Sequence, residues 1–366
     1  MQSFEHGFPE LALAQPDAPP SGESEAALRQ LTLQRLMGYG VEYGDATRIR
    51  TALERRVPWK EGCLAIAESV LANGSLDGIA PSDTTRSTRG LRASAMLRMA
   101  QMMMLHDSPE RTALYRRAAG LFEAAQGAAC EKRLVAVDGG RLVGWLMRPP
   151  GGRTDRVVIV LGGIEGWAMD FEFSARALVQ RGLAVFVLDG PGQGESRFEH
   201  GVFLTPGWKS QLAAVVDHLE AADGASRVGI LGNSMGGNFA MQFAAAEPRI
   251  AACGNNGGMR YPLTQRSRSN FYPKVEAFCD RAAGVQPDAM WATMEMTPER
   301  TAIRCPFLIV HGESDPLVSL DDSQAILGWA PSSDKRMHVF ARGDHCIYDK
   351  PADRMDLTGD WFAGRL

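Results

Sequence analysis

Short apolar runs alternate with amphipathic stretches through the last two thirds of the chain, and this alternation constrains the fold more than any other feature. The runs are rich in Val, Ile, Leu and Phe and span residues 157–161, 184–188, 228–231, 250–253, 307–310 and 336–340. Helices are predicted between them over 173–181, 208–221 and 238–246. This order is typical of a parallel sheet covered on both faces. The turn signal Asp138-Gly139-Gly140 joins two further strands, over 133–137 and 142–147, which makes the predicted sheet mixed.

The first third of the chain has helical spacing and no convincing strand. Residues 1–24 are rich in Pro, Ser, Gly and Glu, and we expect them to form a flexible lead-in. The apolar spacing then predicts one helix that ends near Gly38, helices around 49–53 and 59–70, a polar break over 84–90, and helices over 91–105 and 115–128. The predicted domains are therefore the lead-in 1–24, an all-helical domain 25–130, and a catalytic α/β domain 131–366.

Composition excludes several classes of protein. Hydrophobic residues make up 45% of the 366 residues, enough for a substantial core, and the formal net charge of -4 gives no reason to bind nucleic acid or an anionic membrane. The six cysteines are scattered without a CxxC pair, which argues against a zinc ribbon or a redox motif. Neither a signal peptide nor a membrane-spanning run is evident, and we expect a cytoplasmic protein.

The strongest local signal is Gly232-Asn233-Ser234-Met235-Gly236-Gly237, which follows one predicted strand and precedes a predicted helix. A G-x-S-x-G turn in this context is the nucleophile elbow of the α/β-hydrolase fold. The glycines are needed because the turn is strained and side chains at 232 and 236 would collide with their neighbours. Ser234 is the predicted nucleophile, and the amide of Met235 is expected to bind the developing oxyanion at the helix N-terminus.

A serine hydroxyl needs a base and an orienting acid, and this fold supplies them in the order Ser, Asp or Glu, His. His345 follows the strand 336–340, and Asp315 follows the strand 307–310. Both fall at carboxyl ends of predicted parallel strands, where chemistry collects in open sheets. Glu313 and Asp344 remain alternatives for the acid. His311, in the same loop as Asp315, is expected to be structural.

The segment after the first core strand, Leu161-Gly162-Gly163-Ile164-Glu165-Gly166-Trp167, should supply the second oxyanion amide, from either Gly163 or Ile164. Glu165 is unusual there, since a carboxylate would repel an anionic intermediate. It either assists the reaction by proton exchange or substrate binding, or it is a first-turn acid stabilised by a helix dipole. The glycine-rich loop 189–196 lacks the lysine of a phosphate loop and is predicted to be a structural loop near the active site.

With these residues identified, the chain resembles the family of 2,6-dihydroxypseudooxynicotine hydrolase, the fermentation-respiration-switch-like group, which includes fungal pigment enzymes that shorten polyketides. The resemblance rests on residues 161–165, 189–195, 232–238, 246–253 and 343–346, together with 39–45 in the helical half. It implies that the N-terminal helices cap the active site and take part in a homodimer. Gly166, Trp167 and Met235 depart from the family pattern, so substrate identity does not carry over.

The resemblance also implies hydrolysis of a carbon–carbon bond next to a ketone, without metal or organic cofactor and with help from Glu165. Polyketides, acyl-aromatic compounds and β-dicarbonyl compounds are the expected small-molecule substrates. Trp167, Tyr261 and Trp291 are candidate substrate-binding residues because they are large apolar side chains that suit a ligand pocket. A carboxylesterase, thioesterase or lactonase with the same triad is the main alternative. An inactive hydrolase-fold binding protein is the third.

Overall fold

The computed structural model describes residues 22–72, 79–152 and 154–366, and it divides into two compact units, 1–127 and 128–366. Most of the predicted lead-in, residues 1–21, lies outside the described residues. The lead-in ends earlier than predicted, because a helix already begins at Gly22. The sequence boundary at 130 lies within a few residues of the boundary between the units. The predicted roles of the first unit as a cap and in dimer formation stay predictions.

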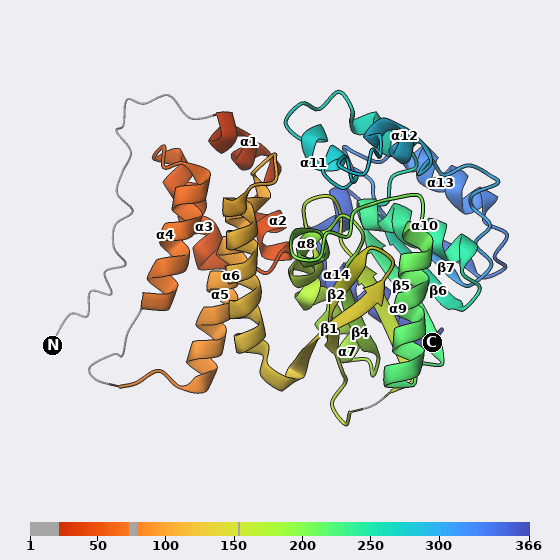
Figure 1. Cartoon of the computed structure of the whole chain (residues 1–366), viewed down its shortest axis with the longest axis horizontal. Helices are drawn as coiled ribbons and strands as arrows, with labels where there is room; N and C mark the ends of the chain where they lie inside the picture. Colours follow the sequence, from red (N-terminus) through yellow and green to blue (C-terminus); the bar gives the residue numbers. More distant parts are fainter. Residues whose placement is uncertain (1–21, 73–78, 153) are drawn as a thin grey trace. The chain divides into compact units, whose positions relative to one another are not determined.

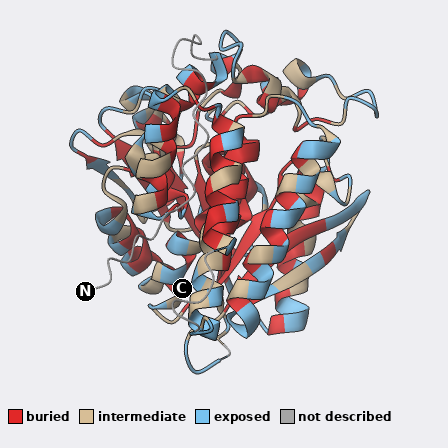
Figure 2. Ribbon diagram, turned by 90° about the vertical axis from the view of Figure 1, so that its left-hand side faces the viewer, coloured by how far each residue is buried: buried red, intermediate tan, exposed pale blue. Residues whose placement is uncertain are grey.

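The described part of the first unit is helical. Its helices are α1 (Gly22–Gln30), α2 (Leu33–Gly38), α3 (Tyr43–Glu54), α4 (Trp59–Ala72), α5 (Asp83–Met102) and α6 (Pro109–Gln126). Figure 1 shows them in red to amber, and Figure 2 shows that their ribbons alternate between buried and exposed residues. The Met-rich stretch of α5 is almost wholly buried, as expected of side chains that fill a core.

Two helix predictions in this unit were wrong, and capping side chains explain both. The single helix predicted before Gly38 is interrupted, because the Thr32 hydroxyl accepts the Arg35 amide at 3.2 Å and starts α2. The polar break predicted over 84–90 lies inside α5, because the Ser82 hydroxyl accepts the Thr85 amide at 3.2 Å and starts that helix earlier. Ser and Thr satisfy the free amides of a first turn, so polar residues can follow them in a helix.

The second unit contains one eight-stranded sheet in the order β1-β2-β4-β3-β5-β6-β7-β8. The strands are β1 (Cys130–Val137), β2 (Gly140–Met147), β3 (Arg156–Leu161), β4 (Ala184–Asp189), β5 (Arg227–Asn233), β6 (Ile250–Asn256), β7 (Phe307–Gly312) and β8 (Lys335–Phe340). The β1–β2 and β2–β4 pairs are antiparallel and the others are parallel. Every predicted strand is therefore present, and the mixed sheet is confirmed.

Helices cover both faces of this sheet. The helices described in this unit are α7 (Glu172–Val179), α8 (Gly194–Phe198), α9 (Trp208–Asp223), α10 (Met235–Ala246), α11 (Tyr272–Glu276), α12 (Pro287–Ala292), α13 (Leu320–Trp329) and α14 (Pro351–Ala363). Helices α9 and α10 pack side by side, and α7 packs against α14, on opposite faces of the sheet (Figure 1). The central strands β3, β4 and β5 are almost wholly buried, which explains their continuous apolar sequences.

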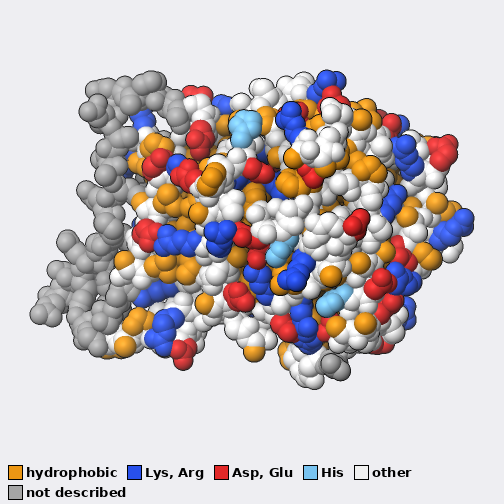
Figure 3. Space-filling view, in the orientation of Figure 1, with side chains coloured by type: hydrophobic (Ala, Val, Ile, Leu, Met, Phe, Trp, Pro, Cys, Tyr) orange, Lys and Arg blue, Asp and Glu red, His pale blue; other side chains and the backbone are white. Residues whose placement is uncertain are grey.

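The surface of the described residues carries many ion pairs. Figure 3 shows acidic and basic side chains interspersed over the visible face. Arg249 is one example, since it contacts Asp217 at 2.6 Å and Glu220 at 2.9 Å between helix α9 and the start of β6. Among the residues that the structure describes, no helix is both long and apolar enough to cross a bilayer.

Candidate active site

Ser234 occupies the tight turn between β5 and α10. Strand β5 ends at Asn233 and α10 begins at Met235, so one residue makes the whole connection. Its backbone lies at φ 54° and ψ -124°, a conformation that side-chain-bearing residues rarely adopt. The Ser234 amide donates to the Asn256 carbonyl at 2.8 Å, which fixes the turn against strand β6. The strained elbow expected from the sequence is therefore present.

The glycines of the elbow are required by backbone contacts. A Cβ atom at Gly232 would lie 2.0 Å from the carbonyl oxygen of Gly236, and a Cβ atom at Gly236 would lie 2.4 Å from that of Gly162. These neighbours are backbone atoms, so they cannot rotate away as a side chain could. The close approach of three chain segments at this point explains the steric pattern of the motif.

His345 links Ser234 to Asp315. Its Nε2 lies 2.9 Å from Ser234 Oγ, and its Nδ1 lies 2.8 Å from Asp315 Oδ2. An ionised carboxylate only accepts hydrogen bonds, so Nδ1 carries the proton and Nε2 is free to accept one from the serine. The other oxygen of Asp315 accepts the amides of Leu317 at 2.8 Å and Val318 at 3.1 Å. The Asp315 side chain is fully buried, so its orientation is fixed on both sides.

The alternative acids make other contacts. Glu313 accepts the backbone amide of Arg342 at 2.8 Å. Asp344 accepts the amide of Tyr348 at 2.6 Å, and burial together with the nearby Asp349 raises the pKa of Asp344 to about 6. His311 is buried with its Nδ1 3.0 Å from Ser323 Oγ, in keeping with the structural role expected for it. The geometry therefore favours Asp315 as the partner of His345.

Opposing effects set the basicity of His345. Burial lowers its pKa, whereas contacts with Cys346 and Asp315 raise it by more, so the net direction is upward from the ordinary value. The Cys346 thiol also donates to the Asn256 carbonyl at 3.4 Å. Asp315 is the carboxylate of these two neighbours, and its Oδ2 lies 2.8 Å from His345 Nδ1.

The loop after β3 runs directly beside the nucleophile. A Cβ atom at Gly163 would lie 3.0 Å from Ser234 Cβ and 3.3 Å from Ser234 Oγ, so a larger residue here would crowd the serine side chain. The Met235 amide belongs to the first turn of α10, where amides have no acceptor within the helix. The predicted oxyanion residues therefore lie near Ser234. Met235 follows it directly in the chain, and Gly163 and Ile164 belong to the loop beside it.

Glu165, two residues further along, forms a buried ion pair. Its Oε1 lies 2.6 Å from Lys274 Nζ, and the side chains of Glu165 and Lys274 are only 4% and 1% exposed. Lys274 belongs to the short helix α11, between strands β6 and β7. The ammonium offsets the carboxylate charge, which removes the objection that an acid in this loop would repel an oxyanion.

Sequence reasoning missed two residues of this site, Lys274 and Gln193. Lys274 lies outside every motif, and its partner is 109 residues away. Gln193 was visible within the loop 189–196, which was predicted to lie near the active site, and its side chain does contact the carbonyls of Gly162 and Gly163. The sequence pattern placed the loop near the active site, but it did not show which atoms the Gln193 side chain contacts.

The three predicted substrate-binding residues have different surroundings. Trp291 is fully buried beside Phe239 and Phe278 and donates its indole N–H to Val275 at 3.0 Å, which is the environment of a core residue. Trp167 is also buried, and its indole N–H donates to Ile164 at 3.2 Å. This contact holds the indole ring against the loop that follows β3.

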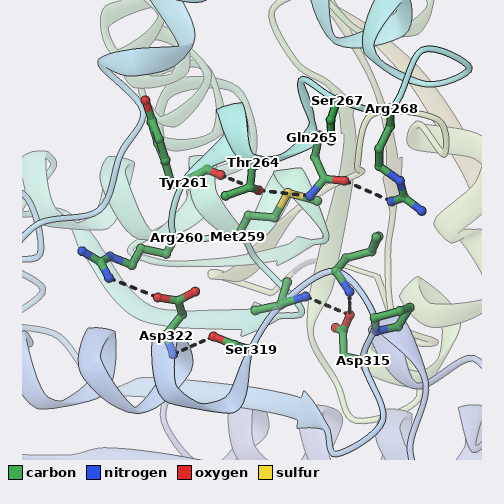
Figure 4. A pocket seen from close by; sticks show the side chains of 13 residues that line it. Met259, Arg260, Tyr261, Thr264, Gln265, Ser267, Arg268, Asp315, Ser319 and Asp322 are labelled. Carbon is green, nitrogen blue, oxygen red and sulfur yellow. Dashed lines mark hydrogen bonds and ion pairs between the residues drawn. The ribbon is translucent and has the colours of Figure 1, made fainter.

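Tyr261 lines a cavity of about 590 Å³ between the segments that follow β6 and β7. Figure 4 shows Asp315 on its wall, with Arg268 bonded to Gln265 and Arg260 bonded to Asp322. Ser234 is not among the lining residues of this cavity. Across the described residues, no group of three or more His, Cys, Asp or Glu side chains is arranged to hold a metal ion.

Comparisons with known proteins agree with this geometry. The family model described as "Serine aminopeptidase, S33" matches residues 152–255 and 282–351. Together with the sheet and the elbow, this makes the chain a hydrolase with the α/β-hydrolase fold.

The similarity to one protein extends over most of the chain. The 2,6-dihydropseudooxynicotine hydrolase of Paenarthrobacter nicotinovorans is 27% identical over 342 residues, which cover 89% of each chain. A crystal structure of the 2,6-dihydroxy-pseudo-oxynicotine hydrolase superimposes with a TM-score of 0.78 at 24% identity, covering 92% of this chain and 96% of that one. The α/β hydrolase ucsC of an Acremonium species is 32% identical over 261 residues, 61% of this chain and 52% of that protein.

Proposed function

We propose that this chain is a serine-dependent hydrolase that cleaves a carbon–carbon bond next to a ketone. The observation that carries the proposal is the continuous hydrogen-bonded relay from Asp315 through His345 to Ser234, with the Glu165–Lys274 ion pair in the adjoining loop. The expected substrates are acyl-aromatic compounds, polyketides and β-dicarbonyl compounds. The similarity to a hydrolase that acts on 2,6-dihydropseudooxynicotine supports a ketone substrate.

In the proposed mechanism, His345 removes the proton from Ser234, and the serine oxygen attacks the ketone carbonyl. The amides of Met235 and of Gly163 or Ile164 hold the oxyanion. When the tetrahedral intermediate collapses, the carbon–carbon bond breaks and its electron pair moves to the leaving carbon. Water then releases the acyl group from the serine. A route in which water attacks the ketone directly and forms a geminal diol uses the same residues.

A carbon leaving group departs only when its electrons are stabilised in an enol or an electron-rich ring and a proton reaches the carbon. The protonated His345 is one source of that proton, since it holds the one taken from Ser234. Glu165 is paired with a buried ammonium, so its carboxylate suits accepting a hydrogen bond from a substrate hydroxyl. We therefore assign proton delivery to His345 and substrate orientation to Glu165.

The setting and assembly of the protein are part of the proposal. All six cysteines are free thiols, which agrees with a reducing, cytoplasmic environment. We propose a homodimer that acts on a small molecule, without nucleic-acid or membrane partners and without a cofactor. Sedimentation equilibrium of the full chain tests the dimer, and a mass of one chain across the concentration range would refute it.

The experiment that tests the function compares wild type with Ser234→Ala and Glu165→Gln on two substrate sets. One set is p-nitrophenyl acyl esters, and the other is acyl-phenols and β-diketones, with products followed by mass spectrometry. Ser210→Ala and Glu299→Gln are matched controls at exposed positions of the same unit. Ketone cleavage that needs both Ser234 and Glu165 supports the proposal. Ester turnover that needs only Ser234, with intact ketones, makes the chain an esterase.

A further inference from the structure

Gln193 holds the loop beside the nucleophile through both hydrogens of its side-chain amide. Its Nε2 donates to the Gly162 carbonyl at 2.8 Å and to the Gly163 carbonyl at 2.9 Å. Its Oε1 accepts the Gly190 amide at 2.9 Å. The residue is 1% exposed, so these contacts are made away from water. Because reversing the amide would turn its oxygen toward two carbonyls, only one orientation is compatible with the site.

These two carbonyls determine where the next two amides point. The peptide bonds that follow Gly162 and Gly163 are trans. In a trans peptide unit the C=O and N–H groups point to opposite sides of the chain. Fixing the carbonyls of Gly162 and Gly163 toward Gln193 therefore directs the N–H groups of Gly163 and Ile164 away from it. A Cβ atom built on Gly163 would lie 3.0 Å from Ser234 Cβ and 3.3 Å from Ser234 Oγ, so this part of the loop faces the serine.

Gln193 is itself anchored, so it can position the loop. It closes a turn in which its own amide donates to the Gly190 carbonyl at 2.9 Å, and its carbonyl accepts the Arg197 amide at 3.0 Å in helix α8. Asp189, at the end of β4, accepts the amides of Glu195 and Ala168, each at 2.8 Å. The loop 189–196 is thus tied to the oxyanion loop at two points, and Gln193 is the one nearer to Ser234.

We propose that Gln193 is a positioning residue that aligns the oxyanion-binding amides of Gly163 and Ile164. The inference rests on the proposed function, because it assigns to these amides the developing charge on a substrate attacked by Ser234. Hydrogen-bond donors stabilise a transition state only when they already point at the charge that develops. A small rotation of the loop would therefore weaken this stabilisation without removing the substrate site.

A fluorophosphonate probe tests this without knowledge of the natural substrate, because Ser234 displaces fluoride from phosphorus while the oxyanion amides hold the phosphoryl oxygen. We compare wild type with Gln193→Met, which keeps the length of the side chain and removes the donor. Gln193→Glu keeps the acceptor for Gly190 and places an oxygen against the two carbonyls. The matched control is Gln242→Met, since Gln242 is 3% exposed and donates to Asn238 at 3.0 Å.

Both Gln193 variants should label about 10- to 100-fold more slowly than wild type, somewhat less than the loss of an oxyanion donor itself. With p-nitrophenyl acetate, kcat should fall by a similar factor while KM stays within about twofold. A merely structural role would lower the melting temperature and affect Gln242→Met equally. Equal labelling of Gln193 variants and wild type, or an equal loss in Gln242→Met, would overturn this inference alone. Absence of Ser234-dependent labelling in wild type would instead overturn the proposed function.

Discussion

Removing the ammonium of Lys274 should destabilise the second unit, because the buried Glu165 carboxylate then loses a charged partner that lies 2.6 Å away. The atoms are 2.6 Å apart and both side chains are at least 96% buried, so water cannot replace the lost partner. Breaking one side of a buried ion pair costs about 3–5 kcal/mol. Lys274→Met, which keeps the aliphatic stem, should therefore lower the free energy of unfolding by about that amount.

Urea denaturation followed by tryptophan fluorescence measures this loss, since six of the seven tryptophans belong to residues 128–366. The double variant Lys274→Met with Glu165→Gln should be more stable than the sum of the single effects predicts, by more than about 1 kcal/mol. Arg266→Met is the control, because its pair with Asp288 is exposed and is worth about 0–1 kcal/mol. Additive single effects, or a Lys274→Met loss no larger than that of Arg266→Met, would refute the reasoning.

Three further predictions follow from the same site. Ser234→Ala or His345→Ala should each lower kcat by several powers of ten in steady-state kinetics, and the double variant should lower it little further. Losses that multiply in the double variant would show that the two residues do not act as one unit. A protonated His345 cannot accept the serine proton, so kcat/KM for p-nitrophenyl acetate should rise with pH through the raised pKa of His345. Asp315→Asn should move that rise to lower pH, and a profile unchanged by this substitution would contradict the prediction. Gly232→Ala, whose Cβ would lie 2.0 Å from a backbone oxygen, should abolish activity and lower the free energy of unfolding in urea by roughly 1–3 kcal/mol. Gly328→Ala, in helix α13 with nothing near the Cβ, should leave activity intact.

The sheet and the relay could be predicted because each has a local signature. Runs such as 184–188 are buried on both faces, so hydrophobicity alone marks them as strands. Ser234, Asp315 and His345 each follow a predicted strand, and parallel strands bring their carboxyl ends together at one edge. The helix α14 was missed because its buried face includes Arg354, Thr358 and Gly359 beside its apolar residues, so it lacks a continuous apolar pattern.

Contacts that depend on three-dimensional packing could not be predicted. Gln193 meets the oxyanion loop across 31 residues, and Lys274 meets Glu165 across 109. Neither separation along the chain corresponds to a helix or strand repeat, so no sequence pattern marks these residues as neighbours. The buried surroundings of Trp291 illustrate the same limit, since a large aromatic residue suits a substrate pocket and a core equally well. The charge balance at Glu165 thus became interpretable only with its partner in place.

The central claim is that Ser234 drives hydrolysis of a carbon–carbon bond, and product analysis of a β-diketone in ¹⁸O-labelled water tests it most directly. With benzoylacetone, the account predicts equimolar benzoic acid and acetone, or acetic acid and acetophenone, with one ¹⁸O atom in the acid. Wild type and Ser210→Ala should both form these products. Ser234→Ala should form neither product. An intact diketone with wild-type protein that still hydrolyses p-nitrophenyl acetate through Ser234, or diketone cleavage that persists in Ser234→Ala, would contradict the claim.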